Sequence, residues 1–493
     1  MILFFLFGIF SCIALTLSFN TLDIRVVYRL IGSALGGEFL VSLALALNFL
    51  STGAIEYYDL GTLTLNNAYF DVSLSLLIDE LSSTFSCILF LALGICFLFL
   101  LSYFSYDFNN TTIVLLSSIF SQLAFIFFAT NDLFTLIFFW EGISFTSFLL
   151  IQYWVGRVAT IKAALKVFTI SQLGDLFFFI FIFTAISQCE STNFEAVLIF
   201  CDLNEFRYLG HLSLVDILAL TLASAMLLKS AQFIFFPWLL DAMEAPVPIS
   251  AQLHSSTLVI IGFYVVYRFY PLVQASYITR ALVFYFAAIT VVSASVLGYV
   301  QRDGKRLLAC STASQLGYVA IALSLDLANE SLLLLIFCCC NKALTFIWFG
   351  LIMDKNGGIS DLRTIKRSKV SQLERLGLFF STLSSTIGPY SLGWHVKALC
   401  SRGVLALDQT SAALALGLLS VTWFFSTIYL FALCFSLMCL PETSSFMRGT
   451  PSYFNGSRAL STYEANALMF VLVVAVQATL TSTSIYWTFF YAS

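Results

Sequence analysis

Six ionisable side chains stand inside long apolar runs of this sequence. They are Glu141, Asp175, Lys229, His254, Lys342 and Lys397. A charge at the centre of a bilayer costs about 2.5–3.5 kcal/mol on insertion scales, so each of these residues needs a partner or a role. Carboxylates, lysines and a histidine on separate apolar runs are the groups that hold and pass protons.

A buried lysine beside a carboxylate can be loaded with a proton and discharged. Desolvation disfavours the ammonium, whereas a nearby carboxylate stabilises it. Moving or neutralising the carboxylate therefore releases the proton, and a histidine can relay it near physiological pH. The predicted proton track consists of Glu141, Lys229, His254, Lys342 and Lys397, with Asp175 as a supporting polar group.

Each of these residues also has a purely structural interpretation. Glu141 and Lys229 then form an ion pair that only holds two helices together. Lys342 and Lys397 then extend along apolar stems to a membrane interface, and His254 packs as a satisfied core histidine. Residue by residue the sequence leaves these alternatives open, but a set of such groups on separate helices favours the track.

Prolines near two of the lysines predict interrupted helices. Pro237 lies eight residues after Lys229, and Pro389 lies eight residues before Lys397. Proline removes a backbone hydrogen bond and breaks or kinks a helix. Broken helices inside membranes mark ion and substrate paths, so we expect two helix breaks beside the predicted track.

The stretch WLLDAMEAPVPISAQLHSS, residues 238–256, concentrates polar signals between two apolar runs. We interpret it as the reconnection from the first broken helix into the next span, with Asp241 and Glu244 as supporting polar residues. An ordinary proline-rich turn with solvated acids accounts for these two carboxylates. It does not account for Lys229 and His254 on either side.

The composition of the chain indicates whether its helices lie in water or in a membrane. The chain has 493 residues, of which 60% are hydrophobic and 10% are charged, whereas a soluble domain carries about 25% charged residues. Long apolar runs, rather than alternating ten-residue strands, predict spanning helices. We expect an all-α polytopic membrane protein with a single transmembrane domain over residues 1–493.

Hydropathy predicts about fourteen transmembrane helices. The predicted spans are 2–18, 30–50, 84–103, 112–129, 132–152, 165–187, 214–240, 250–270, 281–299, 305–325, 331–353, 373–399, 411–439 and 464–489. The first run has no basic leader and is interpreted as a span rather than a removable signal. Basic loops after the first, fifth, ninth and eleventh spans place the N-terminus on the outer side.

Other classes of site are excluded by composition. The net charge of −4 excludes a nucleic-acid footprint. The 12 cysteines form no CxxC pair and lie mostly in apolar runs, as buried apolar residues do. Three histidines provide no obvious haem or iron–sulfur site, and we expect no bound metal.

Two motifs carry a resemblance to a known family. DAMEAPVPISAQLHSS and KRLLACSTASQLGY, together with LLIDELSS around Asp79, resemble the chain 5 family of NADH-ubiquinone oxidoreductase. These are the antiporter-like membrane-arm subunits of respiratory complex I, and the resemblance covers roughly residues 75–400. Asp79 is added to the supporting polar residues on this ground.

The resemblance implies an antiporter-like fold with inverted repeats at residues 112–270 and 281–439. It implies that NADH, flavin, iron–sulfur and quinone chemistry lie in other subunits, so that this chain binds no cofactor. The implied partners are other membrane-arm subunits of complex I, especially a chain 4-like subunit, and membrane lipids. The implied location is the mitochondrial inner membrane, with a bacterial inner membrane as the alternative.

The resemblance also implies a role for each residue of the track. Glu141 and Lys229 would be the input pair for protons. His254 and Lys342 would be the central relay, and Lys397 would be the lysine on the exit side.

Several positions depart from the family pattern. Cys338 stands where relatives often have histidine, Ala398 where they have an acidic residue, and Gln172 where they have arginine. Relatives continue into a long lateral helix, which does not fit between the last two predicted spans at 1.5 Å per residue. We expect that helix to be absent or supplied by a separate polypeptide.

Three functions follow from these observations. The first is a proton-translocating subunit of complex I. The second is a subunit of a multisubunit cation/proton antiporter. The third is a structural membrane-arm subunit with a degenerate proton path, and it is suggested by Cys338 and Ala398.

Overall fold

The computed structural model describes a mostly helical protein. The described residues are 55–64, 71–104, 110–189, 191–203, 208–209, 212–255, 257–365, 370–385, 401, 417 and 420–433. Within them, eight segments are long and apolar enough to cross a membrane. They are α3 (Glu80–Tyr103), α4 (Asn110–Ala129), α5 (Leu133–Ile151), α6 (Val158–Cys189), α10 (Val247–Ser255) with α11 (Leu258–Arg268), α13 (Tyr277–Val300), α14 (Gly304–Ser324) and α15 (Ala328–Lys355).

The predicted helical class is confirmed, whereas the predicted count of fourteen spans stays a prediction. The runs at 2–18, 30–50 and 464–489 lie outside the described residues. The span predicted at 214–240 forms two helices, α8 (Leu214–Lys229) and α9 (Pro237–Asp241), with an interruption between them. Parts of the twelfth and thirteenth predicted spans are described, as α16 (Gln372–Ser385) and a helix at Ser420–Leu433.

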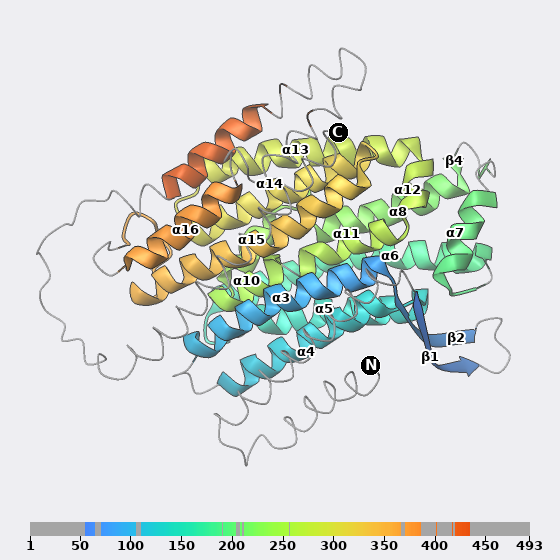
Figure 1. The fold of residues 1–493 in the computed structure, drawn as a ribbon, viewed down its shortest axis with the longest axis horizontal. Coiled ribbons are helices and arrows are strands. Elements are labelled where there is room, and N and C mark those ends of the chain that lie inside the picture. Colours follow the sequence, from blue (N-terminus) through green and yellow to red (C-terminus); the bar gives the residue numbers. More distant parts are fainter. Residues whose placement is uncertain are drawn as a thin grey trace, which may run out of the picture.

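The long helices lie side by side in one bundle (Figure 1). The early helices α3, α4 and α5, drawn in blue and cyan, form one side, and α13 to α16, in yellow and orange, form the other. The green helices α8 to α11 run between them, and α10 packs against both α3 and α15. The interrupted helix and the proline-rich stretch therefore lie between the two halves of the bundle.

The connection predicted at 51–83 contains an antiparallel hairpin of β1 (Glu56–Thr64) and β2 (Asp71–Ile78). Its Ser75 carbonyl accepts a hydrogen bond of 3.1 Å from the backbone N–H of Asn131. The Ser75 hydroxyl donates to Asp132 Oδ2 over 3.3 Å. The hairpin thus covers the turn between α4 and α5 at one end of the bundle, visible at the right of Figure 1.

Short elements join the helices at the same end of the bundle. They are α7 (Phe194–Leu203), β3 (Tyr208–Leu209), β4 (Leu212–Ser213) and α12 (Tyr270–Ala275). At the other end, the 3-10 helix η1 (Ala242–Glu244) follows α9 directly and leads into α10.

Candidate functional site

Lys229 is the last residue of α8, and its side chain is almost fully buried. Its Nζ lies 2.7 Å from Asp175 Oδ1 of α6 and donates to Ser144 Oγ of α5 over 2.6 Å. The ammonium also lies 5.0 Å from the ring centre of Trp140, which is a favourable cation–π position. The indole Nε1 of Trp140 donates to the same Asp175 oxygen over 2.5 Å. Three helices therefore meet at one buried ion pair.

Local sequence explains why this pair forms. Gly174, next to Asp175, lets α6 approach α8 so closely that an added Cβ would lie 3.1 Å from Leu228 Cβ. Trp140 and Ser144 are four residues apart on α5 and so share one face, the face that meets Lys229. The ammonium at the C-terminus of α8 is also favoured by the helix dipole.

The expected role of Glu141 and Lys229 as the input pair stays a prediction. The carboxylate within ion-pair distance of Lys229 is that of Asp175, which the sequence analysis had placed among the supporting groups. Glu141 is rotated about 100° around the helix axis from Trp140 and about 60° from Ser144. Its Oε2 accepts a hydrogen bond of 3.1 Å from Gln172, the residue that replaces the arginine of the family pattern.

The interruption after Lys229 occupies residues 230–236. Ala231 and Ile234 have φ angles of 53° and 75°, in the left-handed region that side-chain-bearing residues rarely adopt. Pro237 is the first residue of α9, where the missing N–H costs no helical hydrogen bond. The Leu228 carbonyl at the end of α8 accepts a hydrogen bond of 3.1 Å from Trp238 Nε1, so it keeps a partner.

His254 of α10 lies beyond that tryptophan. Its ring is 6.3 Å from the ring of Trp238, and 2% of the residue is exposed. Within the described residues neither ring nitrogen has a hydrogen-bond partner. Among the described residues, His254 is therefore not the satisfied core histidine of the structural interpretation. The helix itself is discontinuous here, because α10 ends at Ser255 and α11 begins at Leu258.

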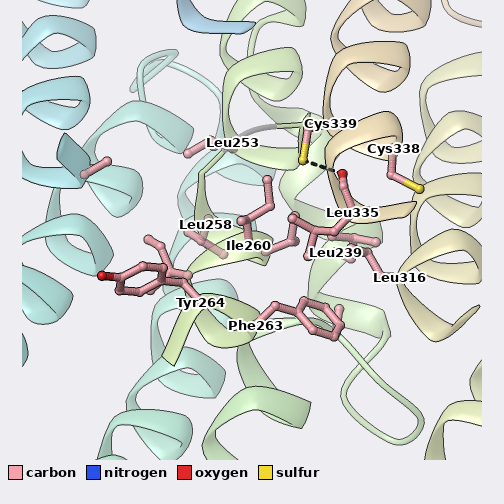
Figure 2. Packing of buried hydrophobic residues seen from close by; sticks show 14 of the residues in the cluster. Leu239, Leu253, Leu258, Ile260, Phe263, Tyr264, Leu316, Leu335, Cys338 and Cys339 are labelled. Carbon is pink, nitrogen blue, oxygen red and sulfur yellow. Dashed lines mark hydrogen bonds between the residues drawn. The ribbon is translucent and has the colours of Figure 1, made fainter. Parts of the chain in front are cut away.

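Apolar side chains surround this region. In Figure 2, Leu253 and Leu258 pack near Leu239, Leu316 and Leu335 from α9, α14 and α15. Cys339 donates to the Leu335 carbonyl over 2.8 Å, and Cys338 points to the other side of α15 (Figure 2). Both thiols are buried among hydrophobic residues, as their sequence context predicted.

Lys342 is the next buried lysine, near the middle of α15. About 2% of it is exposed, and its Nζ donates to Ser311 Oγ of α14. Lying fourteen residues into a helix of 28 residues, it sits about 21 Å along the axis from Ala328. This depth excludes simple extension of the lysine to the nearer membrane interface.

The exit-side lysine, Lys397, lies outside the described residues, as do Pro389 and Ala398. The predicted track therefore stays a prediction, and four of its five residues lie within the described residues. Lys229, His254 and Lys342 are buried on α8, α10 and α15, and α10 packs against α15.

The remaining predicted polar residues are not in the track. Asp79 caps α3 by accepting from the Ser82 N–H over 2.9 Å, and it forms an ion pair with buried Arg268 of α11. Asp241 lies 2.5 Å from Lys166, and Glu244 lies 3.4 Å from Arg306. These three carboxylates hold helix ends and connections together. Sequence reasoning missed the Asp79–Arg268 pair because its members are 189 residues apart.

Among the described residues no group of three or more histidine, cysteine, aspartate or glutamate side chains could hold a metal ion. The site instead consists of buried charged groups. An ammonium with a carboxylate, a hydroxyl and an indole around it, at the end of an interrupted membrane helix, defines a polytopic membrane protein of the broken-helix class, in which such interruptions mark ion and substrate paths.

Comparison with known proteins specifies the class. The model of the NADH:quinone oxidoreductase/Mrp antiporter transmembrane family matches residues 130–422. Because this is more than half of the chain, the protein belongs to that family. The predicted resemblance and the antiporter-like fold are confirmed.

Curated relatives carry the chain 5 name or its bacterial counterpart. NADH-ubiquinone oxidoreductase chain 5 of Paramecium tetraurelia is 31% identical over 333 residues, which are 66% of this chain and 58% of the relative. Chain 5 of Papio hamadryas is 30% identical over 80% of this chain and 64% of its own length. NADH-quinone oxidoreductase subunit L of Rickettsia conorii is 29% identical over 68% of this chain and 52% of the relative. The matched region thus spans less than two thirds of the relatives' own length.

Solved structures share the fold. A chain of respiratory complex I from Thermus thermophilus with bound NADH matches with a TM-score of 0.78 at 18% identity, covering 98% of this chain and 96% of that one. A chain of the archaeal membrane-bound sulfane sulfur reductase matches with a TM-score of 0.77, also at 18% identity, covering 98% of both. The predicted location, a multi-pass protein of the mitochondrial inner membrane, agrees with the chain 5 relatives and the apolar helices.

Proposed function

We propose that this chain is a proton-translocating membrane-arm subunit of NADH:ubiquinone oxidoreductase, complex I. The observation that carries the proposal is the buried Lys229–Asp175 pair at the end of the interrupted helix α8. A lysine with 3% of its surface exposed stays charged only while a carboxylate faces it, so its proton is held conditionally. Family membership and the chain 5 relatives support the proposal that this site belongs to a redox-driven pump.

The proposed mechanism begins with protonation or displacement of the carboxylate of Asp175. The ammonium of Lys229 then loses its compensating charge, and release of its proton becomes favourable. Neutral His254 has one ring nitrogen that can accept a proton, and among the described residues neither ring nitrogen has a hydrogen-bond partner. Water in the interruption would bridge the gap, because the freed backbone groups provide polar partners there.

Lys342 is the next proposed carrier. Its buried Nζ donates to Ser311 Oγ of α14, so the lysine is held inside the bundle rather than at its surface. We propose Lys397 as the exit-side carrier, and Glu141 as a proton donor to the Lys229–Asp175 pair through Gln172 or water. Residues 112–270 and 281–439 would form the two inverted repeats that present these groups.

The chain itself would carry out no redox chemistry. Its enzymatic part would be that of one subunit in a proton-translocating NADH:ubiquinone reductase, with NADH, flavin, iron–sulfur clusters and quinone bound by other subunits. We propose a chain 4-like antiporter subunit as a direct neighbour in the membrane arm and lipids around the exposed helices.

The test compares two lysines of the same complex. Lys229→Met is expected to assemble but to lose most of this subunit's share of protons per electron, measured in sealed vesicles at matched NADH oxidation rates. Lys166→Met is the matched control, because Lys166 is half exposed and pairs with Asp241 at the bundle end. Unchanged proton stoichiometry in Lys229→Met would contradict the proposal and favour a structural subunit with a degenerate path.

The family model also names Mrp antiporters, so a cation/proton antiporter subunit is the second candidate. Purification separates the two. Co-migration of the chain with NADH dehydrogenase activity supports complex I. An assembly that lacks this activity and exchanges sodium for protons supports the antiporter.

A further inference from the structure

A short connecting segment, residues 241–245, joins α9 to α10 between the two halves of the bundle. It runs from the end of α9 through η1 to the extended residue Ala245, and then into α10. Ala242, Met243 and Ala245 in it are buried. Because the segment links the interruption after Lys229 to the helix that carries His254, its position sets the relation between these two groups.

Lys305 of α14 holds the connecting segment by its backbone. Its Nζ donates to the Met243 carbonyl over 3.2 Å and to the Ala245 carbonyl over 2.8 Å. Hydrogen bonds from a charged donor are stronger than neutral ones. Backbone contacts also fix the chain itself rather than a flexible side chain.

Two other cations reach the same segment, but only through side chains. Lys166 pairs with Asp241, and Arg306 pairs with Glu244 over 3.4 Å. All four of these side chains are between 31% and 51% exposed, and exposed pairs are screened by solvent and contribute little. Lys305 is therefore the cation whose loss should matter most.

The start of α14 is fixed where Lys305 leaves it. An added Cβ on Gly304 would lie 2.1 Å from the ring of Phe349 on α15, so only glycine permits this contact between α14 and α15. The Gly304 N–H also donates to the Ser360 carbonyl over 2.9 Å. Lys305 is thus anchored on a part of the second half that has little freedom to shift.

The same helix continues to the second buried lysine. Six residues after Lys305, Ser311 of α14 accepts the hydrogen bond from Lys342. Every described residue of α14 from Leu307 to Leu323 is buried, so the close-packed helix transmits strain along its length. A displacement of the connecting segment would therefore reach the surroundings of Lys342 through α14.

We propose that Lys305 is a positioning residue that locks the connecting segment to α14 and thereby couples the Lys229 and His254 side of the bundle to Lys342. The coupling part of this inference rests on the proposed function. The locking part does not, because it concerns only the contacts of one ammonium with two carbonyl groups.

The test measures the lock and the coupling separately in the intact complex. Lys305→Met removes the charged donor while keeping an apolar stem of similar length. Amide hydrogen exchange in residues 242–255 is expected to become about tenfold faster, because two charge-assisted hydrogen bonds are lost. Lys305→Arg keeps a charged donor and should restore slow exchange, and Arg306→Gln should leave exchange near the wild-type rate.

The second readout is protons translocated per electron at matched NADH oxidation rates. Lys305→Met is expected to lower this ratio at least twofold, with Lys305→Arg close to wild type. Unchanged exchange in Lys305→Met, or an equal effect in Arg306→Gln, would overturn the lock. Faster amide exchange in Lys305→Met with an unchanged number of protons per electron would overturn the coupling. The proposed function would then still be tested by the Lys229 variants.

If Lys305→Met prevents assembly, Lys305→Gln provides the same decision. Lys305→Gln keeps one neutral hydrogen-bond donor. An amide exchange rate in residues 242–255 that lies between the wild-type rate and the rate of an unrestrained segment supports the lock. A wild-type rate overturns it.

Discussion

Replacing Asp175 by asparagine removes the counter-charge of Lys229 with almost no change of shape. The asparagine oxygen can still accept from Trp140 Nε1, so the contact between α5 and α6 is kept. At 2.7 Å and an effective dielectric constant of 20, the attraction between the two charges is about 6 kcal/mol. Breaking one partner out of a buried pair costs about 3–5 kcal/mol. The ammonium of Lys229 is destabilised by that amount.

Proton translocation should therefore fall sharply in Asp175→Asn, whereas Glu141→Gln should have a smaller effect. Glu141 has no ion pair among the described residues and is bound by the neutral amide of Gln172. The assay is the initial rate of proton uptake in vesicles, divided by the rate of NADH oxidation. The amount of assembled complex on a native gel controls for folding.

The two variants together decide which carboxylate serves Lys229. An Asp175→Asn complex that translocates at the wild-type ratio, beside a Glu141→Gln complex that does not, would refute the pairing seen in the structure. It would return the counter-charge to Glu141, as the sequence first suggested. Equal and complete loss in both would show that the two carboxylates act as one unit.

Two further predictions concern packing and pH. Gly304→Ala places a methyl group against the buried ring of Phe349 and should lower the free energy of unfolding by about 1–3 kcal/mol, measured as a lower unfolding temperature. The control Gly94→Ala, whose new methyl group meets open space, should leave the unfolding temperature unchanged. Outside the membrane-spanning segments, hydrogen bonds from Arg363 lower the pKa of Asp361 from 3.8 to about 2. The stability that this carboxylate gives its loop is therefore fully present above pH 4 and is lost as the pH falls towards 2. Arg363→Gln should return the pKa of Asp361 towards its ordinary value and abolish this pH dependence, measured by amide exchange of residues 360–364.

Much of the fold followed from the residues alone. Apolar runs of the right length predicted spanning helices, and Pro237 after Lys229 predicted an interrupted one. Charges within those runs identified Lys229, His254 and Lys342, because a buried ionisable group is costly wherever it lies. These are properties of composition and local spacing, which a single sequence contains.

The partners of these groups did not follow. Glu141 and Asp175 both lie in apolar runs, and only the rotation of α5 and α6 about their axes decides which one faces Lys229. Rotation is set by packing between helices, here by the closeness that Gly174 permits between α6 and α8. A single sequence does not record which ridge meets which groove.

The hairpin in the connection at 51–83 was missed for a different reason. The stretch DVSLSLLI alternates polar and apolar residues up to Leu76, which is the period of a half-buried strand. This alternation is short and lies between long apolar runs, and the interpretation of the region followed those runs. Its tie to Asn131 depends on contacts across more than fifty residues, which periodicity does not contain.

The left-handed residues Ala231 and Ile234 have a consequence for how the protein responds to charge. Each such conformation costs about 1–3 kcal/mol, so the backbone beside Lys229 is under tension that its neighbours must restrain. Ala231 and Ile234 lie two and five residues after Lys229. A rearrangement that follows release of the Lys229 proton can therefore change their backbone conformation. In the proposed mechanism, release of the Lys229 proton can therefore change the backbone conformation beside it as well as its side chain. A change of charge then causes a change of structure at this point of the membrane protein.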